Sequence, residues 1–254
     1  MNGDLKRDLV TTNIYDDSVS VLLGDGNGSF TSRTNYSVGD EPDSVALGDL
    51  DNDGDLDIAF TAGYGSDMLK ILSGDGFGSF ELGEANYEVG DDPASLVIGD
   101  LEGDGDLDIV TANAGGNSLS LLLSSSDGSF SSTTYDAAGK SPLAVALGDV
   151  DEDDDQDILF TSKSYNYSAE ILTSLSYSDD SNDKVSVLLH NDDGSFTPGD
   201  DYAVGDTPES LVVGDLDGDG DLDIVTANAG DDSLSVLLGD GDGSFISESQ
   251  RTVR

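Results

Sequence analysis

Four stretches of the chain carry acidic residues at every second position, and this pattern indicates cation binding. Each begins Asp-x-(Asp/Glu)-x-Asp and has aspartate again at position 9, counted from the first Asp. Carboxylates at positions 1, 3, 5 and 9 can converge only if the chain wraps tightly, which a glycine at position 6 permits because it tolerates a positive φ. Clustered carboxylates repel one another and take up protons unless a cation lies among them. The four loops span residues 49–57, 100–108, 149–157 and 215–223.

Calcium is the ion that this ligand pattern favours. Ca²⁺ accepts about six to eight oxygens in flexible geometry, whereas Mg²⁺ demands an octahedron. Side chains at positions 1, 3, 5 and 9, with the backbone carbonyl of position 7 and water, supply a suitable set. We therefore predict Ca²⁺ as the cofactor, with these ligand residues: Asp49, Asp51, Asp53, Asp55, Asp57, Asp100, Glu102, Asp104, Asp106, Asp108, Asp149, Asp151, Asp153, Asp155, Asp157, Asp215, Asp217, Asp219, Asp221 and Asp223.

Two other interpretations of the loops were weighed. An EF-hand needs a glutamate at position 12 and flanking helices, but position 12 is Phe60, Thr111, Phe160 or Thr226, and the flanks are β-like. Aspartate and glycine also form plain solvated turns, but four copies in phase argue against that. In the third loop Asp154 replaces the glycine, which leaves its geometry open.

A weaker partial site is predicted at the start of the chain. Asn2, Asp4 and Asp8 match positions 3, 5 and 9 of a loop, but Leu5 stands where glycine belongs and position 1 is missing. We expect little binding here.

The loops belong to a repeat of about 50 residues. The tripeptide Gly-Ser-Phe recurs in phase with them, ending at Phe30, Phe80, Phe130, Phe196 and Phe245. Short apolar runs separated by turn signals every 8–12 residues or so indicate an all-β protein, and four strands per repeat are typical of propeller blades. We predict a single β-propeller domain over residues 1–254, of about five four-stranded blades. The approximate repeat units are 1–40, 41–90, 91–140, 141–205 and 206–254.

The first blade lacks its first strand in this pattern, and nothing near the C-terminus resembles that strand. We expect either an arc with one incomplete blade or, preferably, a piece of a longer chain that forms part of a larger ring. One repeat is lengthened over residues 162–184, where Tyr165, Tyr167 and Tyr177 could contact a partner or only cover their own loop.

Composition excludes several classes of protein. The chain has 54 Asp plus Glu against 9 Lys plus Arg, a formal net charge of −45, so it repels phosphate and is not expected to bind nucleic acid. Cysteine is absent and histidine occurs once, which excludes disulfides and thiolate or multi-histidine metal sites. No apolar run approaches the roughly 20 residues of a transmembrane segment. Four Ca²⁺ ions would compensate only a small part of this negative charge. The excess is explained either by solubility through self-repulsion or by adaptation to high salt.

One phrase resembles a known family. Residues 214–228 read Gly-Asp-Leu-Asp-Gly-Asp-Gly-Asp-Leu-Asp-Ile-Val-Thr-Ala-Asn, which resembles the FG-GAP/VCBS repeat of integrin α-subunit-like β-propellers and of many bacterial and archaeal surface proteins. The resemblance implies that each acidic loop is the hairpin between the first and second strands of a blade and holds Ca²⁺.

Three functions remain open at this point. The leading one is a non-enzymatic, calcium-binding propeller module of a secreted or cell-surface protein, which mediates adhesion or recognises an unknown protein or glycan ligand. An extracellular location fits weak calcium sites, which fill only at millimolar calcium. The alternatives are a structural spacer, or the non-catalytic part of a polysaccharide-active enzyme. A catalytic role for the chain itself, as a polysaccharide hydrolase or lyase, is disfavoured because nearly all converging carboxylates are committed to metal.

Overall fold

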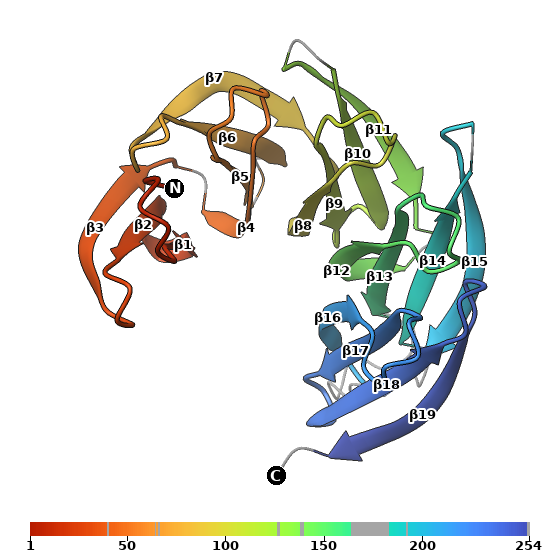
Figure 1. Cartoon of the computed structure of the whole chain (residues 1–254). Coiled ribbons are helices and arrows are strands. Elements are labelled where there is room, and N and C mark those ends of the chain that lie inside the picture. The colour runs from red at the N-terminus through yellow and green to blue at the C-terminus, as the bar shows by residue number, and fades with distance from the viewer. Residues whose placement is uncertain are drawn as a thin grey trace, which may run out of the picture. The chain divides into compact units, whose positions relative to one another are not determined.

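The chain folds into antiparallel β-sheets that follow one another along the sequence. The computed structural model describes residues 1–39, 41–63, 65, 67–125, 128–137, 140–163, 183–191 and 193–252. In each sheet the strands pair in chain order, so every sheet is a simple meander (Figure 1). Tyr165, Tyr167 and Tyr177 of the long insertion, which could contact a partner or only cover their own loop, lie outside the described residues.

The first sheet has three strands and the other four sheets have four each. The first contains β1 (Leu9–Asn13), β2 (Ser18–Gly24) and β3 (Phe30–Ser37), with the short 3₁₀ helix η1 (Ile14–Asp16) after β1. The second contains β4 (Pro42–Gly48), β5 (Asp57–Ala62), β6 (Met68–Gly74) and β7 (Phe80–Glu88). The third contains β8 (Pro93–Gly99), β9 (Asp108–Asn113), β10 (Ser118–Ser124) and β11 (Phe130–Asp136).

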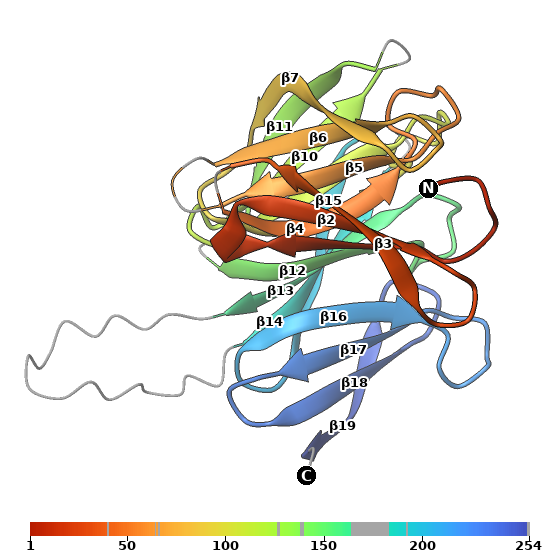
Figure 2. The same ribbon diagram turned by 90° about the vertical axis from the view of Figure 1, so that its left-hand side faces the viewer.

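The fourth sheet contains β12 (Ser141–Gly148), β13 (Asp157–Lys163), β14 (Lys184–His190) and β15 (Phe196–Ala203). The fifth contains β16 (Pro208–Gly214), β17 (Asp223–Asn228), β18 (Ser233–Gly239) and β19 (Phe245–Thr252); Figure 2 shows its strands β16, β17 and β18 side by side. The fold class predicted from the sequence is confirmed: the sheets are propeller blades, and the first blade lacks its first strand.

The sequence explains where these strands begin and which of them are buried. Proline begins β4, β8 and β16, a position where its missing N–H costs no ladder hydrogen bond. The second strands β5 and β9 are buried at every residue, including polar ones such as Asp108 and Thr111. Their counterpart in the first sheet, β1, is half-buried or exposed throughout. It lies at the edge of its sheet, because no first strand pairs with it.

The chain divides into two compact units, Met1–Asp136 with the first three sheets and Ala137–Arg254 with the last two. The prediction of one domain over the whole chain stays a prediction. In the first unit, one apolar cluster joins the first two sheets through residues such as Val19 and Phe60, and a second joins the second and third sheets. In the second unit, one cluster joins the fourth and fifth sheets. The core therefore lies between neighbouring sheets, since one sheet cannot bury both its faces alone.

The phenylalanine of the Gly-Ser-Phe tripeptide is part of this packing. Within each unit, a tyrosine from the fourth strand of one blade meets the edge of the phenylalanine in the next blade. The ring centroids are 5.8 Å apart for Tyr36 and Phe80, 5.3 Å for Tyr87 and Phe130, and 5.2 Å for Tyr202 and Phe245. Phe30, in the first blade, is 37% exposed. Burial of this residue type therefore depends on a preceding blade.

Candidate metal centre

Each acidic loop connects the first and second strands of a blade, as the family resemblance implied. Two residues of the loop have left-handed backbone conformations, at positions 4 and 6. In the first loop these are Asn52 (φ 60°) and Gly54 (φ 93°). Position 6 of the third loop is Asp154, which takes the same conformation with φ 74°. A side chain there does not prevent the wrap, which settles what the sequence left open. The left-handed conformation at position 4 was not predicted from the sequence, because Asn, Gly and Glu all occur there and no single residue type indicates it.

Three of the four loops bring carboxylates close enough to share one ion. In each of these groups the ligand oxygens lie within 4.8 Å of one another. The first loop joins positions 1, 3 and 5, whereas the third and fourth loops join positions 1, 3 and 9. The groups are Asp49, Asp51 and Asp53; Asp149, Asp151 and Asp157; and Asp215, Asp217 and Asp223.

The second loop has the same backbone wrap but no such group of three among the described residues. Its amides bond as in the first and third loops: Gly105 N donates to Asp100 Oδ2 at 2.9 Å and Asp106 N to Asp104 Oδ1 at 3.0 Å. Position 3 is Glu102 here, and its side chain is one methylene longer than aspartate. All the ligands predicted for this loop stay predictions.

The partial first site is held by protein cations. The N-terminal ammonium of Met1 lies 3.5 Å from Asp8 Oδ2, and Lys6 Nζ lies 3.2 Å from Asp4 Oδ2. Asn2 is tied to this turn through its Oδ1, which accepts from Asp4 N at 3.3 Å. The expectation of little binding at Asn2, Asp4 and Asp8 stays a prediction.

The aspartate at position 9 is a structural bridge as well as a candidate ligand. Asp57, which is 2% exposed, accepts from Leu50 N through Oδ2 and from Gly74 N through Oδ1, both at 2.9 Å. The carboxylate thus ties the acidic loop to the end of the third strand of its blade. The same two bonds recur at Asp108, Asp157 and Asp223. The sequence pattern marked this residue as acidic but did not show its second role.

Two buried carboxylate oxygens in these loops have no hydrogen-bond partner, Asp49 Oδ1 and Asp151 Oδ1. A buried charged oxygen without a partner is costly, and a cation in the group would satisfy it. All donors in the three groups are carboxylate oxygens, the hard ligands that Ca²⁺ prefers. The residues therefore fit a calcium ion.

The pKa values show the same electrostatic conflict. Burial, with smaller contributions from Asp51 and Asp53, raises the pKa of Asp57 above its usual range. Burial, with Asp151 and Asp153 adding to it, raises the pKa of Asp157 to about 6. A cation in the group would favour the charged carboxylates and reverse these shifts. The loops are therefore arranged to gain stability from a bound ion.

The acidic side chain at position 7 lies beside the loop rather than in the groups of three. Asp106 Oδ1 accepts from Asn52 Nδ2 of the preceding blade at 2.7 Å. In the fifth sheet, the carboxylate of Glu152 from the preceding blade contributes to raising the pKa of Asp221, after desolvation and the charge of Asp219. Position 7 thus contacts position 4 of the neighbouring loop in both units, a link the sequence did not show.

Among the described residues, no helix is long and apolar enough to cross a membrane. No protein of curated function matches the chain. Solved structures share its fold. A putative 6-phosphogluconolactonase from Bacteroides uniformis is 12% identical, with a TM-score of 0.73 over 100% of this chain and 69% of its own. A periplasmic gluconolactonase from Pseudomonas aeruginosa is 15% identical, with a TM-score of 0.69 over 97% and 67%. A protein from Lactobacillus plantarum is 16% identical, with a TM-score of 0.65 over 96% and 67%.

At these identities the likeness shows the fold alone. The family model agrees with the repeat in the sequence and with the blades in the structure. The model described as FG-GAP-like repeat matches residues 1–60, 49–111, 100–160, 169–226 and 215–253. The acidic loops and the blades that carry them are thus one repeating unit, and the chain belongs to the FG-GAP-like repeat family.

Proposed function

We propose that the chain is a calcium-binding β-propeller module of a secreted or cell-surface protein, which recognises a protein or carbohydrate ligand in adhesion. The observation that carries the calcium role is the convergence of carboxylates in three loops, two of which hold a buried oxygen without a partner. In each loop the position 9 aspartate ties the site to the third strand, so a bound ion would brace the whole blade.

Weak calcium sites of this kind support an extracellular location. Modules that bind Ca²⁺ with dissociation constants of about 10⁻⁴–10⁻³ M fill outside cells, where the ion is plentiful. The loops are largely exposed, and exposed charge pairs are screened by water and salt, which favours modest affinity. The adhesive role rests on the exposed ends of rigid blades, where connecting segments commonly carry binding residues.

The test for calcium compares two exposed aspartates that each accept a backbone N–H two residues further along the chain. Asp217 Oδ1 accepts from Asp219 N at 3.2 Å, and Asp242 Oδ1 accepts from Ser244 N at 3.1 Å. Asparagine keeps that acceptor in both places and removes the charge. Asp217 belongs to a group of three carboxylates, whereas Asp242 lies in a plain turn. Calorimetric titration with Ca²⁺ should therefore show one site lost in Asp217→Asn and none in Asp242→Asn.

Equal calcium binding by both variants and the parent chain would refute the assignment. The recognition role has a separate test, a glycan and protein array probed with and without EDTA. Binding that disappears with EDTA supports recognition by the calcium-loaded blades. A chain that binds calcium but nothing on such arrays would support the alternative of a structural spacer.

The proposal includes no catalysis. Two of the solved structures named above are called gluconolactonases, but identities of 12% and 15% carry the fold and not the reaction. In the described residues, the converging carboxylates are the candidate ligands of the loops. Hydrolysis of gluconolactone or of polysaccharides by the purified chain would contradict this part of the proposal.

A further inference from the structure

The fourth sheet differs from the others beside its acidic loop. The residue at the end of the third strand, whose N–H bonds to the position 9 aspartate, is glycine or serine in the other sheets: Gly24, Gly74, Ser124 and Gly239. In the fourth sheet it is His190, the one histidine of the chain. At the three glycines a Cβ would lie 2.0–2.3 Å from a backbone carbonyl oxygen of the acidic loop. In these three sheets the position therefore excludes a side chain, whereas Ser124 and His190 carry one.

His190 is buried, and one of its ring nitrogens has no hydrogen-bond partner. The residue is 7% exposed, and Nδ1 is buried without such a partner. The ring packs against Phe196, with centroids 4.9 Å apart and planes inclined by 58°. Its backbone N–H is held by Asp157 at 2.8 Å. The imidazole is thus fixed in place, and its Nδ1 has no hydrogen-bond partner.

The carboxylate oxygen Asp155 Oδ2 lies 3.4 Å from this nitrogen. That separation is longer than an ordinary N–H···O hydrogen bond, which ends near 3.2 Å or so. Two ligand atoms each about 2.1 Å from a tetrahedral zinc ion lie about 3.4 Å apart. The pair therefore has the spacing of two ligands that share one small ion.

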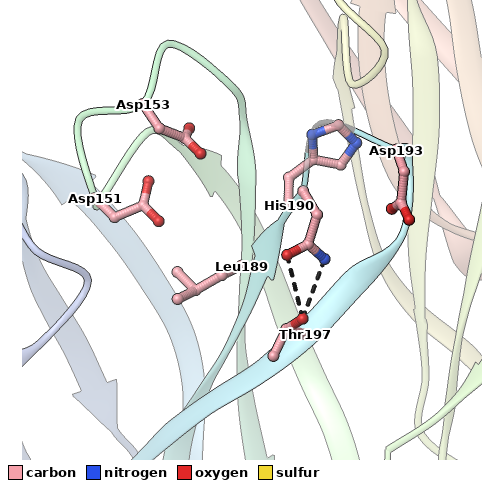
Figure 3. Close-up of a pocket in the computed structure, with 7 residues that line it drawn as sticks. Asp151, Asp153, Leu189, His190, Asp193 and Thr197 are labelled. Carbon is pink, nitrogen blue, oxygen red and sulfur yellow. Dashed lines mark hydrogen bonds between the residues drawn. The ribbon is translucent and has the colours of Figure 1, made fainter.

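Open space adjoins the imidazole. A pocket of about 550 Å³ is lined by His190 with Asp151, Asp153 and Asp193, and by Leu189, Asn191 and Thr197. Figure 3 shows the ring between the loop that carries Asp153 and the turn that carries Asp193. This space can hold water molecules beside the imidazole ring, and its acidic walls attract a cation.

We propose that His190 Nδ1 and the Asp155 carboxylate bind a divalent transition-metal ion of the zinc type, next to the calcium loop of the fourth sheet. Imidazole nitrogen suits zinc and related ions, whereas Ca²⁺ takes oxygen ligands. Asp155 is free for this role because the loop pattern assigns only its backbone carbonyl to calcium. Water in the pocket fills the remaining positions. The two sites therefore select different ions.

A single histidine makes the test direct. The full chain, labelled with ¹⁵N and kept in millimolar Ca²⁺ to fill the acidic loops, is titrated with Zn²⁺ near neutral pH. We expect the imidazole resonances to shift and to saturate at one equivalent of zinc, because no other histidine contributes to that signal. Substoichiometric Co²⁺ should broaden the same resonances.

Two variants separate this site from the calcium loops. His190→Gly restores the residue of three other sheets and should lose one zinc ion in calorimetry with Ca²⁺ in excess. Asp155→Asn should weaken that zinc binding at least tenfold. The matched control is Asp55→Asn, which changes position 7 of a loop that has no histidine beside it. This substitution should leave zinc binding unchanged. Calcium binding should be the same in His190→Gly, because His190 is not one of the predicted calcium ligands.

Imidazole resonances that do not move with zinc would overturn the proposal, and this measurement needs no variant. Equal zinc binding by the parent chain and His190→Gly would also overturn it, since that result is expected when His190 and Asp155 form only an ion pair. If His190→Gly fails to fold, His190→Gln replaces it. Neither outcome bears on calcium binding in the other sheets.

Discussion

Replacing Asp57 by asparagine should weaken the fold even where calcium is absent. Both oxygens of this buried carboxylate accept backbone N–H groups, from Leu50 and from Gly74, each at 2.9 Å. Asparagine has one acceptor oxygen, so one of the two backbone N–H groups then faces the side-chain NH2 group, which cannot accept its hydrogen bond. A buried donor without a partner costs about 1–3 kcal/mol. We therefore expect Asp57→Asn to lower the free energy of unfolding by about 2 kcal/mol.

The assay is thermal unfolding followed by circular dichroism, once in EDTA and once in millimolar Ca²⁺. For a chain of this size, about 2 kcal/mol lowers the midpoint by roughly 4–8 °C. The matched control is Asp53→Asn in the same loop. Asp53 is exposed, and asparagine keeps the Oδ1 acceptor for Asp55 N at 2.8 Å. In EDTA this control should have the midpoint of the parent chain, or a slightly higher one because the substitution relieves charge repulsion. In Ca²⁺ its midpoint should rise less than that of the parent chain.

The two variants thus separate the bridge from the ligand. If both lower the midpoint in EDTA by the same amount, position 9 has no special structural role and the reasoning is refuted. If Asp57→Asn behaves like the parent chain in EDTA, the two N–H groups find other acceptors and the same conclusion follows.

Three further predictions concern pH, packing and the third loop. In the folded chain the pKa of Asp157 is about 6, above the usual carboxyl value. Protonated Asp157 therefore stabilises the fold in EDTA fully below about pH 4, and this contribution is lost as the pH rises through about 6. The stability of the parent chain relative to Asp157→Asn should fall over that window in EDTA but not in Ca²⁺; a constant difference would contradict this. Phe245→Ala should cost about 3–5 kcal/mol in urea unfolding, and the more exposed Phe30→Ala clearly less; equal losses would refute packing between the fourth and fifth sheets. Asp154→Gly should stabilise the chain in EDTA by about 1 kcal/mol, since φ of 74° strains a non-glycine residue; a loss of stability would show that Asp154 makes a necessary contact.

The blade pattern could be predicted from the sequence because it is written in local signals that repeat. Proline begins three of the first strands, apolar runs such as Asp-Ile-Val-Thr-Ala-Asn form the second strands, and glycine turns separate the third and fourth. The missing strand of the first sheet was visible as a repeat that starts half-way through an acidic loop. Such features depend on residues adjacent in the chain, so they need no knowledge of packing.

The partners of the repeated aromatic residues depended on packing. Gly-Ser-Phe identifies a residue that can be buried, but it does not show that Tyr36 or Tyr202 of the preceding blade provides the contact. Nor does it show that Phe30 remains 37% exposed. Burial needs a neighbouring sheet, and that neighbour lies tens of residues away in the chain.

At the metal loops, the sequence determined which oxygens are available and that they come close together, because spacing and a tight turn are local properties. Only the tertiary structure decided that position 9 links the loop to a distant strand, that position 7 contacts the preceding blade or His190, and that three loops rather than four gather their carboxylates. The links that positions 9 and 7 make outside their own loop join residues 16 to 54 positions apart. Their distances follow from how strands pair and sheets pack, which no single loop encodes.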